Sequence, residues 1–269
     1  MNKLSTLLLV CSLAATSMVQ AGAIRDLTSF TTDTLSRTDD GSSPRVSLGF
    51  EINFFGVKFD SLFVNNNGNV TFDTYESEYT PFGLQATNRQ ILAPFFADVD
   101  TRNELTKEVQ YGQNIINGAK VFGVNWIDVG YFRRGADKLN QFQLIITDRS
   151  DLEIGAFDFE FNYDQIQWES GNASGGDLGL GGDSARMGWS NGNLNTFELA
   201  GSAVNGALLD NGPNALVKGS LNSGVDGRYV FNVRNGQVLP PAPVSTPGSL
   251  ALLFLGTLLL ATRRRKASH

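Results

Sequence analysis

Apolar and polar residues alternate along much of the chain with a period of two, which is typical of β-strands. Residues 157–164 show this most clearly, because an aromatic side chain occupies every second position. Alternate residues of a strand share one face, so this segment is predicted to be a half-buried strand. The side chains expected to face the core are Phe157, Phe159, Phe161 and Tyr163.

Other segments also predict strands. Residues 142–146 repeat the alternation, and residues 228–233 form a late strand. Residues 120–131 are apolar on both faces, which is the pattern of a strand in the middle of a sheet. The run 65–69 lies between two valines and contains an Asn-Gly step, whose positive φ suits the tight turn of a hairpin.

These elements predict the fold class. Between residues 30 and 235 no useful length of chain has the helical period. About ten short strands joined by polar turns predict an all-β fold, a single antiparallel sandwich-like domain over residues 22–236. Residues 170–183, rich in Gly, Ser and Asp, are predicted to form a flexible surface loop. No repeat of fixed period is present, which argues against a solenoid or a propeller.

The N-terminus has the three parts of a secretory signal peptide. A short basic region precedes the apolar residues 4–15, and small residues lead up to Ala21. Residues 1–21 are therefore predicted to be a signal peptide, cleaved between Ala21 and Gly22. The apolar stretch is too short for a bilayer span, which needs about 20 residues.

The C-terminus has the pattern of a short membrane segment. Residues 237–247 form a Pro-rich, extended spacer. Residues 248–262 are apolar and predict a short hydrophobic helix, marginal in length for a span. The basic cluster that follows is expected to stay cytoplasmic, which would leave the domain outside the inner membrane. The residues of this cluster are Arg263, Arg264, Arg265 and Lys266.

This tail, residues 248–269 with the motif before it, resembles the PEP-CTERM sorting signals that exosortases process in Gram-negative bacteria. Those signals usually carry Pro-Glu-Pro before the span, whereas residues 244–248 keep Pro247 and lack the Glu. The resemblance implies an exosortase-like partner and at least transient contact with the inner membrane. A permanent single-pass anchor is the alternative.

The net charge of the central domain argues against one class of partner. The chain has 21 Lys+Arg and 27 Asp+Glu, and five of the bases lie in the two terminal segments. The central domain therefore carries 16 bases against 27 acids, a net charge of about −11. An acidic balance without a basic patch argues against a nucleic-acid partner.

Cysteine and histidine chemistry is excluded from the predicted mature domain, because Cys11 and His269 are the only residues of their kinds. The domain therefore has no disulfide, no Cys or His metal site and no catalytic dyad or triad built on these residues. An exported domain without disulfides is typical of bacteria. Lipid attachment at Cys11 is disfavoured, because Val10 stands where a lipoprotein signal needs a small residue.

Several motifs occur in order between residues 50 and 233. They are FEINFFG at 50–56, LFVNNNGNVTF at 62–72, APFFADVDTR at 93–102, FGVNW at 122–126, FQLII at 142–146 and ARMGWS at 185–190. In this order they resemble a nidogen-like (NIDO) domain. The resemblance implies an extracellular, non-enzymatic module associated with cell–matrix adhesion in animal proteins, and it supplies no catalytic residue.

Asp98 and Asp100 are the candidate metal ligands. They lie two residues apart in an apolar segment, so in a strand both carboxylates would share one face, with Arg102 next to them. The pair could contact Ca²⁺ or carbohydrate, because hard cations prefer several oxygen ligands. The structural alternative is an Asp–Arg network at a strand end, with Arg102 as the partner of any buried carboxylate.

Three other polar runs have local explanations. Asn65–Asn67 could bind sugar hydroxyls, but asparagine is also favoured in tight turns. Residues 148–151 contain two acids that could bind a metal or hydrogen-bond the backbone of a turn. The Gly-Asp steps within residues 175–183 faintly resemble calcium repeats, but a single imperfect copy cannot stack with neighbours.

The sequence thus predicts an exported, non-catalytic protein of the cell surface or extracellular matrix, with a matrix polysaccharide or surface protein as partner. One alternative is a carbohydrate-binding module, with or without Ca²⁺. Trp126, Trp168 and Trp189 could stack on sugars; Trp126 is expected in the core, and Trp168 is the exposed candidate. A glycan hydrolase with paired carboxylates is a further alternative, but no spacing singles out such a pair.

Overall fold

The structure, a computed structural model, describes residues 22–241. The predicted signal peptide, the hydrophobic segment and the basic cluster lie outside this range. Within it the regular elements are strands and one short 3₁₀ turn, η1 (Asn172–Ser174). No helix of residues 22–241 has the length and apolar character needed to cross a membrane.

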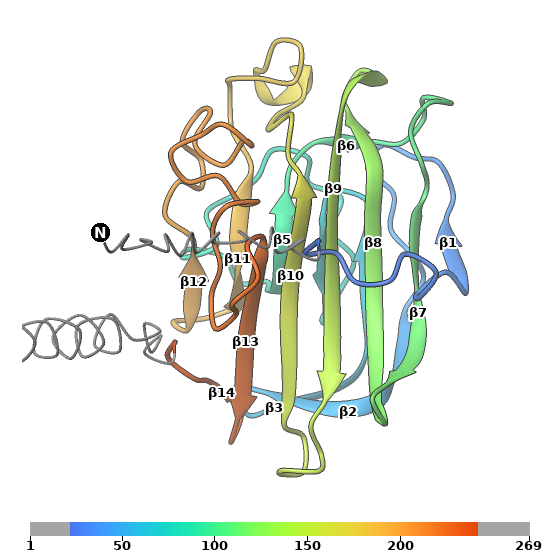
Figure 1. Cartoon of the computed structure of the whole chain (residues 1–269), viewed down its shortest axis with the longest axis vertical. Coiled ribbons are helices and arrows are strands. Elements are labelled where there is room, and N and C mark those ends of the chain that lie inside the picture. The colour runs from blue at the N-terminus through green and yellow to red at the C-terminus, as the bar shows by residue number, and fades with distance from the viewer. Residues whose placement is uncertain (1–21, 242–269) are drawn as a thin grey trace, which may run out of the picture.

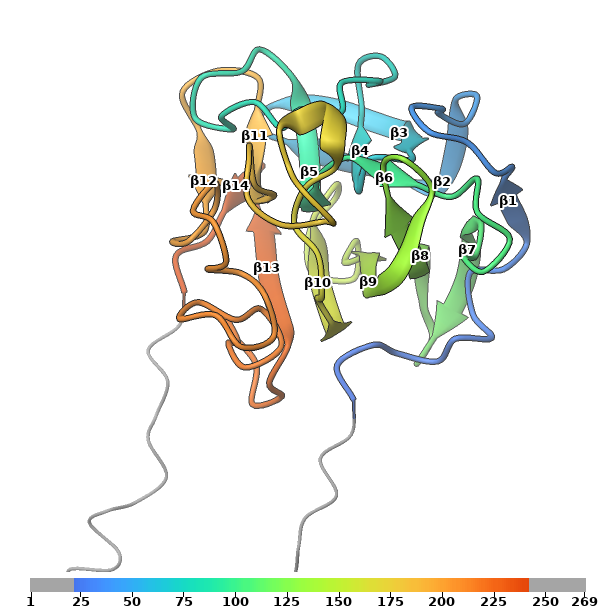
Figure 2. The same cartoon turned by 90° about the horizontal axis from the view of Figure 1, so that it is seen from above.

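The strands form two antiparallel sheets that pack face to face, as Figure 2 shows from above, so the predicted all-β sandwich-like fold is confirmed. The larger sheet has the order β1 (Asp33–Leu35), β7 (Val109–Ile116), β8 (Ala119–Tyr131), β9 (Gly135–Asp148), β10 (Phe157–Gln165), β13 (Arg228–Arg234) and β14 (Gln237–Val238), with β6 (Val99–Asp100) also paired to β8. The smaller sheet has the order β12 (Thr196–Glu198), β11 (Arg186–Asn191), β5 (Gln90–Phe96), β4 (Asn69–Thr71), β3 (Val57–Asn65) and β2 (Val46–Phe54).

The core fills the space between the sheets and is rich in aromatic rings. The four alternate aromatic residues predicted to face the core from β10 are all buried. Phe159 stacks on Phe231 of β13 with ring centroids 4.7 Å apart, and Trp126 of β8 stacks on Phe142 of β9 at 5.2 Å. Such pairs stabilise the fold by about 0.5–1.5 kcal/mol beyond the area they bury.

A strap formed by residues 22–32 covers the outer face of the larger sheet and crosses in front of β9 and β8 (Figure 1). Phe30 is buried against Val121 and Ile145, and it lies over Gly123, where a Cβ would come within 2.3 Å of its ring. The Arg25 guanidinium pairs with the Glu160 carboxylate. The strap explains why β8 is buried on both faces, as its apolar pattern predicts.

The predicted hairpin joins β3 to β4 at the Asn-Gly step. Val64 pairs with Val70 and Asn65 with Asn69, and Gly68 has a φ of +72°. The positive φ disfavours residues other than glycine at position 68. A side chain there would also clash, because its Cβ would lie 1.8 Å from the carbonyl oxygen of Phe95. The hairpin therefore depends on glycine both for its turn and for its contact with β5.

One expectation for the region after β10 is confirmed and one is wrong. Residues 170–183 form a surface loop, with Asp177 and Asp183 exposed, although Ser170 and Ser174 are buried and backbone hydrogen bonds close the loop. Trp168 is fully buried, its indole N–H donates to the Val129 carbonyl at 3.0 Å, and its ring meets Phe95 edge-on. The polar residues beside Trp168 suggested exposure, but its ring packs between the sheets.

Candidate functional site: an aspartate cluster between three segments

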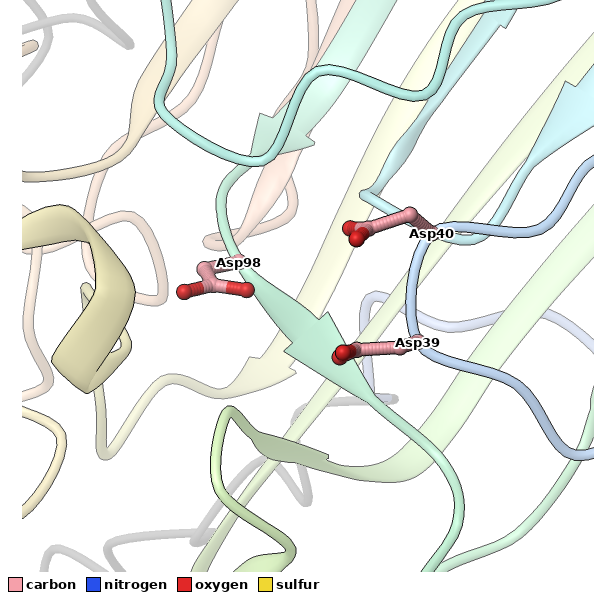
Figure 3. A group of neighbouring side chains, drawn as sticks. All are labelled: Asp39, Asp40 and Asp98. Atoms are coloured by element: carbon pink, nitrogen blue, oxygen red, sulfur yellow. The ribbon is translucent and has the colours of Figure 1, made fainter.

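Three segments that are distant in sequence meet at one end of the sandwich. They are the turn at residues 38–41 between β1 and β2, the connection of β5 to β6 at residues 97–98, and the start of the loop at residues 170–176. Asp39 and Asp40 come from the first segment and Asp98 from the second, and Figure 3 shows the three side chains facing a common space. One carboxylate oxygen from each lies within 4.8 Å of the others.

Asp98 is the most enclosed of the three. Its side chain is 1% exposed, and neither carboxylate oxygen has a well-formed hydrogen bond within the described residues. Gly171 presses on it, since a Cβ there would lie 2.2 Å from Oδ2 of Asp98. Burying a charged carboxylate without hydrogen-bond partners costs folding free energy and is uncommon in folded proteins. A bound cation or a proton would remove this cost at Asp98.

Two asparagines of the turn between β3 and β4 hydrogen-bond to the segments that carry the aspartates. Asn67 donates from Nδ2 to Oδ1 of Asp40 at 2.9 Å and accepts from the Val99 N–H at 3.0 Å. Asn66 donates to the carbonyl of Val99 at 2.6 Å. Both asparagines are buried, so they hold the two acidic segments together and are not available to sugar hydroxyls.

Asp100 forms an ion pair with Arg102. Arg102 contacts both of its oxygens, at 2.9 and 2.6 Å, and the N–H groups of Arg102 and Arg134 also donate to it. Arg102 reaches Asp39 as well, at 3.0 Å. The Asp–Arg network considered from sequence is therefore present, and it includes Asp39 besides Asp100.

The sequence grouped Asp98 with Asp100 on one strand face. Asp100 lies in β6 and Asp98 directly precedes this strand, and its carbonyl accepts a hydrogen bond from the Phe132 N–H beside β8. Both carboxylates lie near Asp39, and Asp98 also lies near Asp40. The signal that could have pointed to the partners is the Asp-Asp-Gly turn at residues 39–41, but its distance from Asp98 in sequence hides the contact.

The pKa values of Asp98 and Asp39 are raised, whereas the pKa of Asp100 is lowered. Burial, followed by the charges of Asp39, Asp40 and Asp100, raises the pKa of Asp98 to about 7. Burial and the charges of Asp100 and Asp40 raise the pKa of Asp39 to about 6, although Arg102 opposes this. Burial acts in the same direction on Asp100, but hydrogen bonds from Arg102 and Arg134 outweigh it and lower its pKa. The cluster therefore concentrates negative charge that Arg102 only partly neutralises.

The remaining candidates have structural partners. The turn at residues 148–151 forms as predicted, with the N–H of Ser150 donating to Asp148 and Arg149 contacting Asp151. Trp126 lies in the core as expected, and Trp189 is 7% exposed. With Trp168 also buried, none of the three tryptophans provides a platform for sugars.

The predicted processing residues lie at the edges of the described range. Gly22 follows the expected cleavage point, and the next residue, Ala23, donates its N–H to Asp164 at 2.9 Å. Ala21, Pro247 and the four basic residues at 263–266 lie outside the described residues.

Comparison with known proteins agrees with the motif order. The family model described as the nidogen-like domain matches residues 60–235. The chain is similar to alpha-tectorin of Mus musculus, with 33% identity over 233 residues, covering 77% of this chain and 10% of that protein. It is also similar to alpha-tectorin of Gallus gallus (30% over 239 residues, 79% and 11%) and to nidogen of Drosophila melanogaster (27% over 221 residues, 72% and 15%).

The chain thus spans only about a tenth of the length of these alpha-tectorins. No solved structure matches it. The family model covers well over half of the chain, and the matched range runs from β3 to the end of β13. The chain therefore belongs to the nidogen-like domain family.

Proposed function

We infer that this protein is an exported, non-catalytic component of the cell surface or extracellular matrix that acts in adhesion or matrix structure. The observation that carries this proposal is the nidogen-like domain shared with alpha-tectorin over 77% of the chain. The relatives alpha-tectorin and nidogen are structural proteins of the extracellular matrix and not enzymes. A matrix polysaccharide or another surface protein is the proposed partner.

The two terminal segments give the proposed route. The signal peptide would direct export and be removed after Ala21. The tail at residues 248–269 would hold the chain in the inner membrane until an exosortase-like enzyme releases it near Pro247. The basic cluster at residues 263–266 would fix the orientation during this step.

The experiment is fractionation of the native cells followed by intact-mass measurement. The expected product begins at Gly22, ends near residues 245–247 and is found on the outer surface or in the medium. A chain that keeps residues 263–266 and sediments with the inner membrane would instead establish a permanent anchor. Retention in the cytoplasm would refute the proposed function.

A variant pair tests the role of the tail. Replacing Pro247 by Ala should cause the unprocessed chain to accumulate in the membrane, because Pro247 is the part of the sorting motif that this chain retains. Pro243→Ala, in the same spacer, is the matched control and should be processed normally. Equal processing of both variants would argue against sorting at Pro247.

A further inference from the structure

We propose that Asp39, Asp40 and Asp98 form a binding site for one Ca²⁺ ion. The site lies where the turn at residues 38–41, the β5–β6 connection and the loop at residues 170–176 meet (Figure 3). It does not depend on the proposed matrix role, because its test reads cation binding by the folded protein.

The spacing of the carboxylates suits a cation of this size. Calcium lies about 2.3–2.6 Å from its oxygen ligands, so two oxygens on opposite sides of the ion are about 4.6–5.2 Å apart. One oxygen from each aspartate lies within 4.8 Å of the others, so the three can contact one ion. Magnesium dehydrates reluctantly and usually keeps several waters beside one or two carboxylates. A set of three carboxylates therefore favours Ca²⁺.

The state of Asp98 is the second, independent observation. Its carboxylate is buried, it faces the space shared with Asp39 and Asp40, and neither oxygen has a well-formed hydrogen bond among the described residues. One oxygen of Asp39, Oδ1, is also buried without a partner. Carboxylate oxygens left in this state are the ligands that a hard cation prefers.

The charges around the site also favour a bound cation. Asp39, Asp40 and Asp98 bring three carboxylates together, and Arg102 is the cation that pairs with Asp39 and Asp100. Asp40 is held by the neutral amide of Asn67. A divalent cation would compensate the charge that Arg102 leaves.

The residues around the three aspartates decide which other groups could bind the ion. The Ser174 hydroxyl lies 3.1 Å from the hydroxyl of Thr80 and is close enough to Asp98 to lower its pKa slightly. Calcium takes six to eight oxygens, so water or such hydroxyls would complete the shell around the three carboxylates. No Cys or His is present in residues 22–241, which removes the ligands that zinc prefers. The bound ion would join the turn at residues 38–41 to the β5–β6 connection, which otherwise meet through Asn66 and Asn67.

The test is thermal unfolding of the purified full chain after removal of divalent ions. Calcium at 5 mM is added, and NaCl of equal ionic strength provides the baseline. Sites of extracellular modules bind Ca²⁺ with dissociation constants of about 10⁻⁴–10⁻³ M, so the Tm should rise by about 5–9 °C at the tighter end of that range. Isothermal titration should give one ion per chain.

Variants assign the effect to this site. Asp98→Asn keeps the shape of the buried side chain, and Asp40→Asn changes a less buried ligand, so at least one of them should fold. Both should abolish the calcium-dependent shift, whereas Asp60→Asn, at an exposed position, should keep it.

Three results would overturn the proposal. They are the absence of a shift in the unmodified chain, a full shift that survives Asp98→Asn, and an equal shift with 5 mM Mg²⁺. The last would show a site without preference for calcium.

Discussion

Gly171 lies against Asp98 so closely that a Cβ on the glycine would be 2.2 Å from Oδ2 of the carboxylate. The same Cβ would meet the Cβ of Phe132 at 2.7 Å. The backbone of Gly171 is extended, with φ −100° and ψ 171°, so it is a conformation open to any residue. Glycine is therefore required at this position by space and not by backbone conformation.

Replacing Gly171 by Ala should lower the free energy of unfolding by about 1–3 kcal/mol, the usual cost of overpacking. Urea unfolding measures the change. Gly224→Ala is the matched control, because Gly224 is exposed and a Cβ there would have no heavy atom within 4 Å. The control should stay within about 0.5 kcal/mol of the unmodified chain. Equal stability of the two variants would contradict the close contact.

Arg102→Met should destabilise the fold by about 3 kcal/mol, because it leaves the fully buried Asp100 without its cation. The loss should be near the low end of the usual range, since two backbone N–H groups still donate to Asp100. The control is Lys58→Met, which breaks an exposed pair with Glu51 and should cost less than about 1 kcal/mol. Chemical denaturation of both variants provides the comparison, and similar small losses would show that Asp100 is adequately held by the backbone alone.

The contribution of the strap at residues 22–32 to stability can be tested through Phe30. Phe30→Ala removes a ring that is 2% exposed and covers Gly123, so the free energy of unfolding should fall by about 3 kcal/mol. Leu27 belongs to the same strap but is 51% exposed, and Leu27→Ala should have little effect. Thermal unfolding followed by circular dichroism measures both. If the two variants unfold at the same temperature, the strap contributes little through its aromatic contact.

The buried tyrosines predict a loss of stability in alkali. Burial and the charge of Asp226 raise the pKa of Tyr229 to about 12, and burial also raises the pKa of Tyr163. The ordinary tyrosine pKa is about 10, so the folded state keeps protons that the unfolded state loses between these values. Stability is therefore fully present below pH 10 and falls from pH 10 to 12, by up to about 1.4 kcal/mol per pH unit for each tyrosine.

Urea unfolding at a series of pH values from 8 to about 11.5 tests this tyrosine effect. Tyr229→Phe should make the decline shallower, because one of the titrating groups is removed. Tyr75→Phe changes an exposed ring and serves as the control. An identical slope in all three proteins would show that Tyr229 does not titrate differently on folding.

Alternation along the chain was sufficient to predict the strands of the core. The β10 aromatics, the apolar β8 and the Asn-Gly hairpin were each determined by neighbours within a few residues, and each is confirmed. Trp168 was misjudged because its burial depends on Val129 and Phe95, which belong to other strands. Local pattern records which side chains share a face, but not what lies across from that face.

The aspartate cluster shows the same limit. Asp98 was identified as a candidate from its place among apolar residues, but its neighbours Asp39 and Asp40 were not. Their contact depends on the route of the chain from β1 to β2, which brings the turn at residues 38–41 beside Asp98. This route is a property of the assembled sandwich, and no spacing in the sequence encodes it.

The strap also constrains the order of folding events. The carbonyl of Ala23 accepts a hydrogen bond from Arg228 at 2.7 Å, across a separation of 205 residues. A chain that emerges with its N-terminus first must therefore deliver almost the whole domain before this contact can form. Long-range pairing of this kind slows folding. The earliest part of the domain to appear is consequently among the last to be fixed, although Phe30 can pack on Val121 and Ile145 as soon as β8 and β9 have paired.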